Sequence, residues 1–82
     1  MGKVNKSFPI NEKEKEEVQQ KFGKRLAELR SGKFTQEKFA FEVGVDRTYI
    51  SYIERGEKNP SLYVLARMAK ALKISLSELV SF

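Results

Sequence analysis

The chain has 82 residues, a formal net charge of +5, and no cysteine or histidine. From this length we expect one small domain with a modest core and no additional domain for sensing a small molecule. Without cysteine there can be no disulfide or thiolate metal site. No apolar run reaches the roughly 20 residues of a membrane span and no secretory signal is evident, so we expect a cytoplasmic protein.

Residues 1–11 contain Gly2, Pro9 and scattered lysines without any periodicity. This composition predicts a flexible amino-terminal arm, followed by one domain over residues 12–82. Phe8 and Ile10 leave open whether part of the arm packs on the domain.

The first helix is predicted to begin after Asn11, a residue type that favours the N-cap position. Acidic residues follow at once, where the helix dipole favours negative charge. The helix should end near Ser31 and Gly32. Its apolar residues recur at helical spacing and should share one face, formed by Val18, Phe22, Leu26 and Leu29.

Two short helices should follow, the first from after Thr35 to about Val43 and the second from after Asp46 to before Gly56. Gly44 suits the left-handed backbone that ends a helix. The predicted inner residues of this pair are Phe39, Ala40, Val43, Val45, Ile50 and Ile53.

A fourth helix should follow Ser61, with Leu62, Leu65, Met68, Ala69 and Leu72 facing inward. Ser75 and Glu78 have the spacing of a capping box and predict a short fifth helix. No strand pattern or repeat is present, so we expect an all-α, compact five-helix domain.

The stretch from Gln36 to Arg55, QEKFAFEVGVDRTYISYIER, combines several requirements of a helix-turn-helix. Ala40 is small where the two helices must cross closely, and Gly44 permits the sharp turn. The remaining apolar positions would lock the second helix onto the first, leaving a polar and aromatic face outward.

This stretch and the residues after it resemble the phage Cro/C1-type (XRE-like) helix-turn-helix regulators, over about residues 22–80. Within that group the DRTYIS, IERG and P-S-L segments are most similar to restriction–modification controller proteins. The resemblance implies a lambda-repressor-like fold that binds double-stranded DNA as a symmetric dimer. Lys73 stands where the family usually has glycine, and Phe41 where it usually has an outward polar residue.

Placing the second helix of the motif in the major groove selects a set of candidate DNA contacts. Arg47 is the best candidate for reading a base, because a guanidinium can bond guanine O6 and N7 together. Gln36 lies at a helix amino-terminus that favours a phosphate. The full set is Gln36, Arg47, Thr48, Tyr49, Ser51, Tyr52, Arg55, Lys58 and Asn59.

Two further sets have other expected roles. The resemblance pairs Arg30 with Glu54 in a partly buried bridge that orients the recognition helix. The apolar surplus near the carboxyl end should form a dimer interface, with candidates Tyr63, Val64, Leu76, Leu79, Val80 and Phe82, although some of these must close the core.

The function expected from this pattern is a sequence-specific DNA-binding transcriptional regulator, acting as a homodimer on a pseudo-palindromic operator. A DNA-binding antitoxin or a phage-type repressor with a protein partner would share the motif, and Phe41 or the arm could then meet that partner. A protein-binding adaptor that never reads DNA is a further alternative. We do not expect an enzyme, a metal site, a cofactor or a small-molecule ligand, because the carboxylates fall at caps or on outer faces.

Overall fold

The computed structural model describes residues 11–82, which form five helices. The predicted arm, including Phe8 and Ile10, lies almost wholly outside the described residues. The helices are α1 (Glu12–Ser31), α2 (Gln36–Val43), α3 (Arg47–Glu54), α4 (Leu62–Leu72) and α5 (Leu76–Leu79). The all-α prediction is therefore confirmed for this part of the chain.

Each helix begins at a side chain that accepts a hydrogen bond from a backbone N–H of the first turn, which would otherwise lack a partner. Asn11 and Glu14 form a capping box at α1, and Ser75 and Glu78 form the predicted one at α5. The other three N-caps are Thr35, Asp46 and Ser61. These local signals explain why the predicted helix starts agree with the structure.

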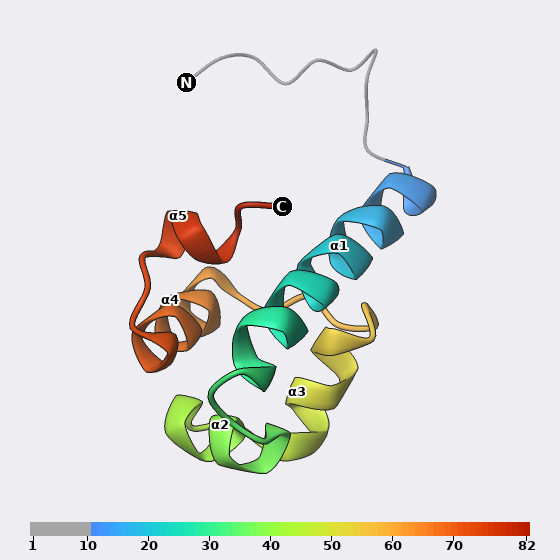
Figure 1. The fold of residues 1–82 in the computed structure, drawn as a ribbon. Coiled ribbons are helices and arrows are strands. Elements are labelled where there is room, and N and C mark those ends of the chain that lie inside the picture. Colours follow the sequence, from blue (N-terminus) through green and yellow to red (C-terminus); the bar gives the residue numbers. More distant parts are fainter. Residues whose placement is uncertain (1–10) are drawn as a thin grey trace.

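Helix α1 is the longest element, and its first turns extend beyond the other helices (Figure 1). Helix α3 packs against both α1 and α2, while α4 contacts α2 and α5. The carboxyl-terminal residues return toward α1, where the Phe82 ring lies 6.2 Å from that of Phe22 between centroids. Arg25 also joins α1 to α5 by donating from Nη2 to the carbonyl of Glu78 at 2.7 Å.

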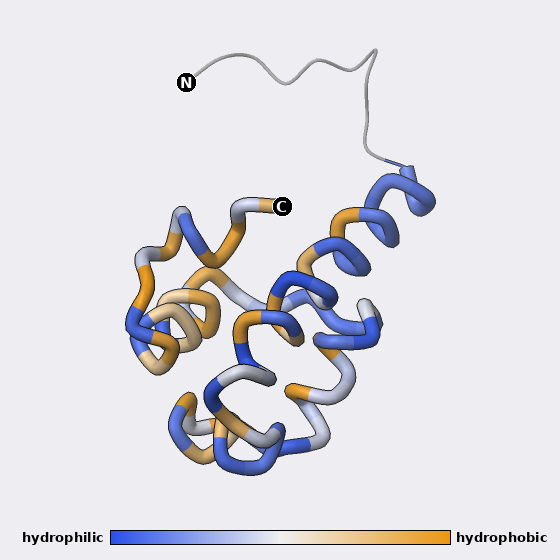
Figure 2. Tube along the Cα trace, viewed as in Figure 1, coloured by the Kyte–Doolittle hydropathy of each residue, from blue (hydrophilic) through white to orange (hydrophobic). Residues whose placement is uncertain are grey.

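The core lies where these helices meet, and every described helix contributes to it. The buried apolar residues are Phe22, Leu26, Phe39, Ala40, Val43, Ile50, Ile53, Met68, Ala69, Leu72 and Leu79. Figure 2 shows mostly hydrophilic residues along the projecting first half of α1. Among residues 11–82, no helix is both long enough and apolar enough to cross a bilayer.

Two predicted core positions are corrected by the structure. Leu62 is 70% exposed, because it lies in the first turn of α4, whereas the buried residues of that helix lie in its second half. Val18 shares the periodicity of the inner face of α1 but is 51% exposed, because the core begins only at Phe22. Periodicity identifies the face of a helix, but not how far along the helix its neighbours reach.

One close helix contact was absent from the sequence interpretation. Gly23 is buried in α1, and a Cβ atom at this position would lie 2.6 Å from the carbonyl oxygens of Ile53 and Glu54. The missing side chain therefore allows α1 to approach the end of α3 directly. A glycine inside an otherwise strong helix was the available sequence signal for such an approach.

Candidate nucleic-acid interface

The turn between α2 and α3 determines where the candidate reading helix points. Gly44 has φ 86° and ends α2 in the left-handed conformation. Its N–H and that of Val45 both donate to the carbonyl of Ala40, at 2.8 and 3.0 Å. Asp46 then caps α3 by accepting from the N–H of Thr48 at 2.7 Å. Only three residues, 44–46, thus separate the two helices.

The hydrogen bonds from Thr48 also lower the pKa of the Asp46 carboxyl below its ordinary value, and the positive charge of Arg47 adds to this effect. The cap carboxylate therefore stays ionised at neutral pH. Its charge lies beside Arg47, yet residues 11–82 contain no ion pair that involves Arg47.

Burial separates α3 into an inner and an outer set. Ile50 and Ile53 are fully buried against the core. Arg47 and Thr48 are exposed, whereas Ser51 and Tyr52 are half-buried. Tyr49, another candidate contact, packs partly against the core, so only part of its side chain is available on the outer face.

A network around Glu54 fixes the carboxyl-terminal end of α3. Arg30 donates from Nε and Nη2 to the two carboxylate oxygens, at 2.6 and 3.0 Å, and the paired side chains are only 14% and 7% exposed. The Arg30 Nη1 atom also bonds the carbonyl of Phe34 at 2.9 Å. The predicted pairing of Arg30 with Glu54 is therefore confirmed, and it joins α1 to α3.

Gln36 belongs to the same network, which its sequence position did not indicate. Its Nε2 atom donates to Glu54 Oε1 at 2.9 Å, so the side chain is directed toward the protein. A phosphate at this position would therefore contact the backbone amides at the start of α2. The Gln36 side chain could contact it only after leaving Glu54.

Two other candidates, Arg55 and Lys58, lie near the ring of a third, Tyr52, at the end of α3. The Arg55 guanidinium lies 4.8 Å and the Lys58 ammonium 5.9 Å from the centroid of the Tyr52 ring. Arg55 donates to Ser51 Oγ at 3.2 Å and pairs with Glu57 at 3.2 Å. Asn59 follows in the exposed loop. These cations could contact phosphates, which would position a duplex without specifying its sequence.

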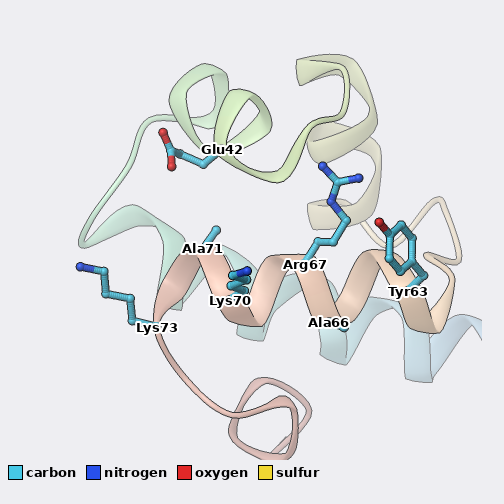
Figure 3. Close-up of a pocket in the computed structure, with 7 residues that line it drawn as sticks. All are labelled: Glu42, Tyr63, Ala66, Arg67, Lys70, Ala71 and Lys73. Carbon is cyan, nitrogen blue, oxygen red and sulfur yellow. The ribbon is translucent and has the colours of Figure 1, made fainter.

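The residues predicted for a dimer interface do not form one patch. Leu79 is fully buried in the chain's own core, so its assignment to the interface was wrong. Val64 and Leu76 are partly buried against the same core. Tyr63 lines a separate hollow between α2 and α4 (Figure 3).

Val80 and Phe82 do lie together, beside a groove of about 180 Å³. The other residues that line this groove are the apolar Val18, Phe22, Pro60 and Leu65, the polar Gln19, and two of the predicted DNA contacts, Lys58 and Asn59. Val80 and Phe82 are 40% and 54% exposed. The groove lies between the start of the core in α1 and the carboxyl-terminal end.

Phe41 lies on the outer side of α2 and is 77% exposed. Its ring has the Lys38 ammonium 5.9 Å from the centroid.

Within residues 11–82, the acidic side chains form no cluster suited to a metal ion.

Known proteins are similar to this chain in sequence and in fold. A family model described as helix-turn-helix matches residues 24–79. The control protein C.MunI of Mycoplasma sp is 43% identical over 79% of this chain and 90% of its own length. The control protein C.BamHI of Bacillus amyloliquefaciens is also 43% identical, over 74% of this chain and 78% of its own.

A solved structure is similar over the same part of the fold. The restriction–modification controller protein C.AhdI from Aeromonas hydrophila superposes with a TM-score of 0.73 and 44% identity, over 77% of this chain and 96% of its own. The likeness thus spans most of each of these small proteins.

Proposed function

The chain belongs to the helix-turn-helix family, and from this membership we propose that it is a sequence-specific DNA-binding transcriptional regulator. The family is one of transcription regulators and not of enzymes. The observation that carries the proposal is the outer face of α3, where Arg47 and Thr48 are exposed and Arg47 has no ion-pair partner among residues 11–82. Such a helix can place a guanidinium and a hydroxyl against base edges.

The relatives suggest the specific role of a restriction–modification controller. C.MunI and C.BamHI are named control proteins, and C.AhdI is named a restriction–modification controller protein. In this role the protein would bind upstream of restriction–modification genes and control their transcription. The genomic neighbourhood checks it, because an adjacent endonuclease or methyltransferase gene is expected.

A homodimer on a pseudo-palindromic operator is the finer part of the proposal. Two reading helices related by a two-fold axis contact half-sites about 34 Å apart, one turn of DNA. The apolar groove beside Val80 and Phe82 offers a surface that a second copy could cover. Covering it would remove two exposed apolar side chains from water in each chain.

A second candidate function is favoured by the exposed ring of Phe41. A DNA-binding antitoxin or a phage-type repressor would need a surface for a protein partner, and this ring on α2 could belong to one. An adjacent toxin gene, together with co-purification of its product, would favour this candidate over the controller.

The test of DNA recognition is a duplex selected from a random library, compared with a shuffled duplex of equal length. We expect the selected duplex to bind about a thousandfold more tightly, with the logarithm of the affinity falling linearly with the logarithm of salt concentration. Equal binding of the two duplexes at every salt concentration would remove the proposal.

Two variants separate discrimination between DNA sequences from general affinity for DNA. Arg47→Ala should reduce discrimination between the duplexes by roughly tenfold to a hundredfold, the contribution of one good base contact. Arg55→Ala, the matched control outside the groove, should weaken both duplexes similarly and reduce the salt dependence by about one ion.

A further inference from the structure

A second surface lies apart from the reading helix, in the hollow between α2 and α4 (Figure 3). Its volume is about 690 Å³. Most of its wall comes from α4, and Glu42 of α2 closes the opposite side. No residue of α3 and none of the first turn of α2 lines it. The hollow is therefore distinct from the candidate DNA contacts.

The α4 wall is strongly basic. Arg67, Lys70 and Lys73 recur at every third residue, so they follow one side of the helix and its end. All three are exposed, and within residues 11–82 none of them is in an ion pair. Three neighbouring cations without acidic partners repel one another. A ligand that brings carboxylates would reduce this electrostatic repulsion.

The shape of the wall favours a helix as the ligand. Ala66 and Ala71 line the hollow between the long side chains, and their small size lets another backbone approach α4 closely. Tyr63 adds an aromatic ring at the amino-terminal end, with the Arg67 guanidinium 5.5 Å from its centroid. The small residues, flanked by cations and an aromatic ring, leave room for a second helix to lie along α4.

Glu42 restricts which helix fits. Its carboxylate would repel a ligand that is acidic all round, including a DNA backbone entering the hollow. A helix with carboxylates on the side that meets α4 and neutral or basic residues toward α2 satisfies both walls. We propose that the hollow binds an acidic amphipathic helix of a protein partner. This interaction surface is additional to the proposed DNA recognition and does not depend on it.

The experiment uses the full chain, labelled with ¹⁵N, and a synthetic helical peptide with glutamates along one side. The control peptide carries glutamines in their place. Amide shifts should change around Glu42 and over residues 63–73 on adding the glutamate peptide, and not on adding the glutamine peptide. The double variant Arg67→Gln/Lys70→Gln should weaken binding by roughly tenfold or more, as expected for removing two complementary charges.

Two control variants make the result specific. Lys24→Gln removes an exposed charge of α1 outside the hollow and should leave peptide affinity unchanged. Arg47→Ala should also leave it unchanged, although it weakens the proposed DNA binding. A circular dichroism spectrum checks that each variant is folded.

Two outcomes would overturn the proposal. Shift changes centred on residues 47–52 would mean that the peptide only imitates DNA on the reading face. Unchanged peptide affinity in the double variant, together with weaker binding of duplex DNA, would assign Arg67 and Lys70 to phosphate contacts instead.

Discussion

Arg30 and Glu54 form a two-point ion pair that ties the end of α1 to the end of the candidate reading helix, with Nε–Oε2 and Nη2–Oε1 distances of 2.6 and 3.0 Å. Both side chains are mostly buried. Removing one partner leaves the other charge in a poorly hydrated site, and this generally costs more than the intact pair contributes.

Arg30→Met should therefore lower the free energy of unfolding by about 3 kcal/mol, near the lower end for breaking a buried pair. Urea unfolding followed by circular dichroism measures this change. The matched control is Arg55→Met, which breaks the exposed pair with Glu57 and should change stability by less than about 1 kcal/mol. Similar losses in the two variants would contradict the structural role given to Arg30.

Gly23→Ala should destabilise the protein by about 1–3 kcal/mol, because the added methyl group would force α1 away from α3. In an ordinary helix interior the same substitution stabilises by about 1 kcal/mol, so the expected sign is diagnostic. Thermal unfolding provides the measurement.

Gly32→Ala is the control for that variant. Gly32 has φ −77° and ψ −9°, and a Cβ there would meet no atom within 4 Å. This substitution should be neutral or stabilising by up to about 1 kcal/mol. A stabilising effect at both positions would mean that α1 and α3 are not in close contact.

Lys73 ends α4 with φ 59° and ψ 41°, a left-handed conformation that a side chain disfavours. Lys73→Gly should raise the free energy of unfolding by about 1 kcal/mol, because glycine accepts this backbone without the steric cost. Lys70→Gly, inside the same helix, should lower it by about 1 kcal/mol. Thermal unfolding of both variants checks whether the two signs are opposite.

The Asp46 cap should make stability depend on pH in the acid range. Hydrogen bonds from Thr48 lower the folded-state pKa of Asp46, so the unfolded chain takes up the proton first. The stabilisation is therefore present above the ordinary aspartate pKa of about 3.9 and is lost as the pH falls through the lower folded value. Asn also caps helices but does not titrate.

Asp46→Asn should accordingly reduce the loss of stability between about pH 5 and pH 3, a window set by the ordinary aspartate pKa. Melting temperatures measured across that window test the prediction. Glu78, whose pKa is lowered by hydrogen bonds from Ser75, should show the same sign in Glu78→Gln. Parallel pH profiles of the variants and the original protein would count against both assignments.

Phe82→Ser should weaken the proposed dimer without unfolding the chain, because Phe82 is half-exposed at the carboxyl end and contacts Phe22 from outside the core. Sedimentation should show a shift toward monomer, and affinity for a selected palindromic duplex should fall with it. Phe41→Ser removes an equally large exposed ring from α2 and should leave the dimer intact. An unchanged association state in Phe82→Ser would place the interface elsewhere.

Local signals predicted most of the fold. The five caps from Asn11 to Ser75 and the left-handed turn at Gly44 depend on residues next to one another, so the sequence contains them directly. The exposure of Leu62 depends on how far the other helices reach along α4, and no local pattern contains this information. Leu79 was misassigned for the same reason, since only the packed domain decides which apolar residues remain outside.

The candidate site also has one part that the sequence predicts and another that only the structure shows. The outward placement of Arg47 and Thr48 follows from the helical period of α3 and agrees with the structure. The bond from Gln36 to Glu54 joins residues from two helices, and the hollow beside α4 requires α2 to lie opposite it. Contacts of this kind become visible only when the helices are placed in space.

The exposed side chain of Arg47 is in no ion pair among residues 11–82, whereas Arg30, Gln36 and Glu54 are bonded to one another at the other end of α3. Mutation can therefore exchange Arg47 without breaking an ion pair that holds α3 in place. Under the proposed DNA recognition, gene copies of this protein could diverge quickly in the base that this position reads while their scaffold stays constant. A cell containing several such genes could keep their regulation separate through changes at only a few codons.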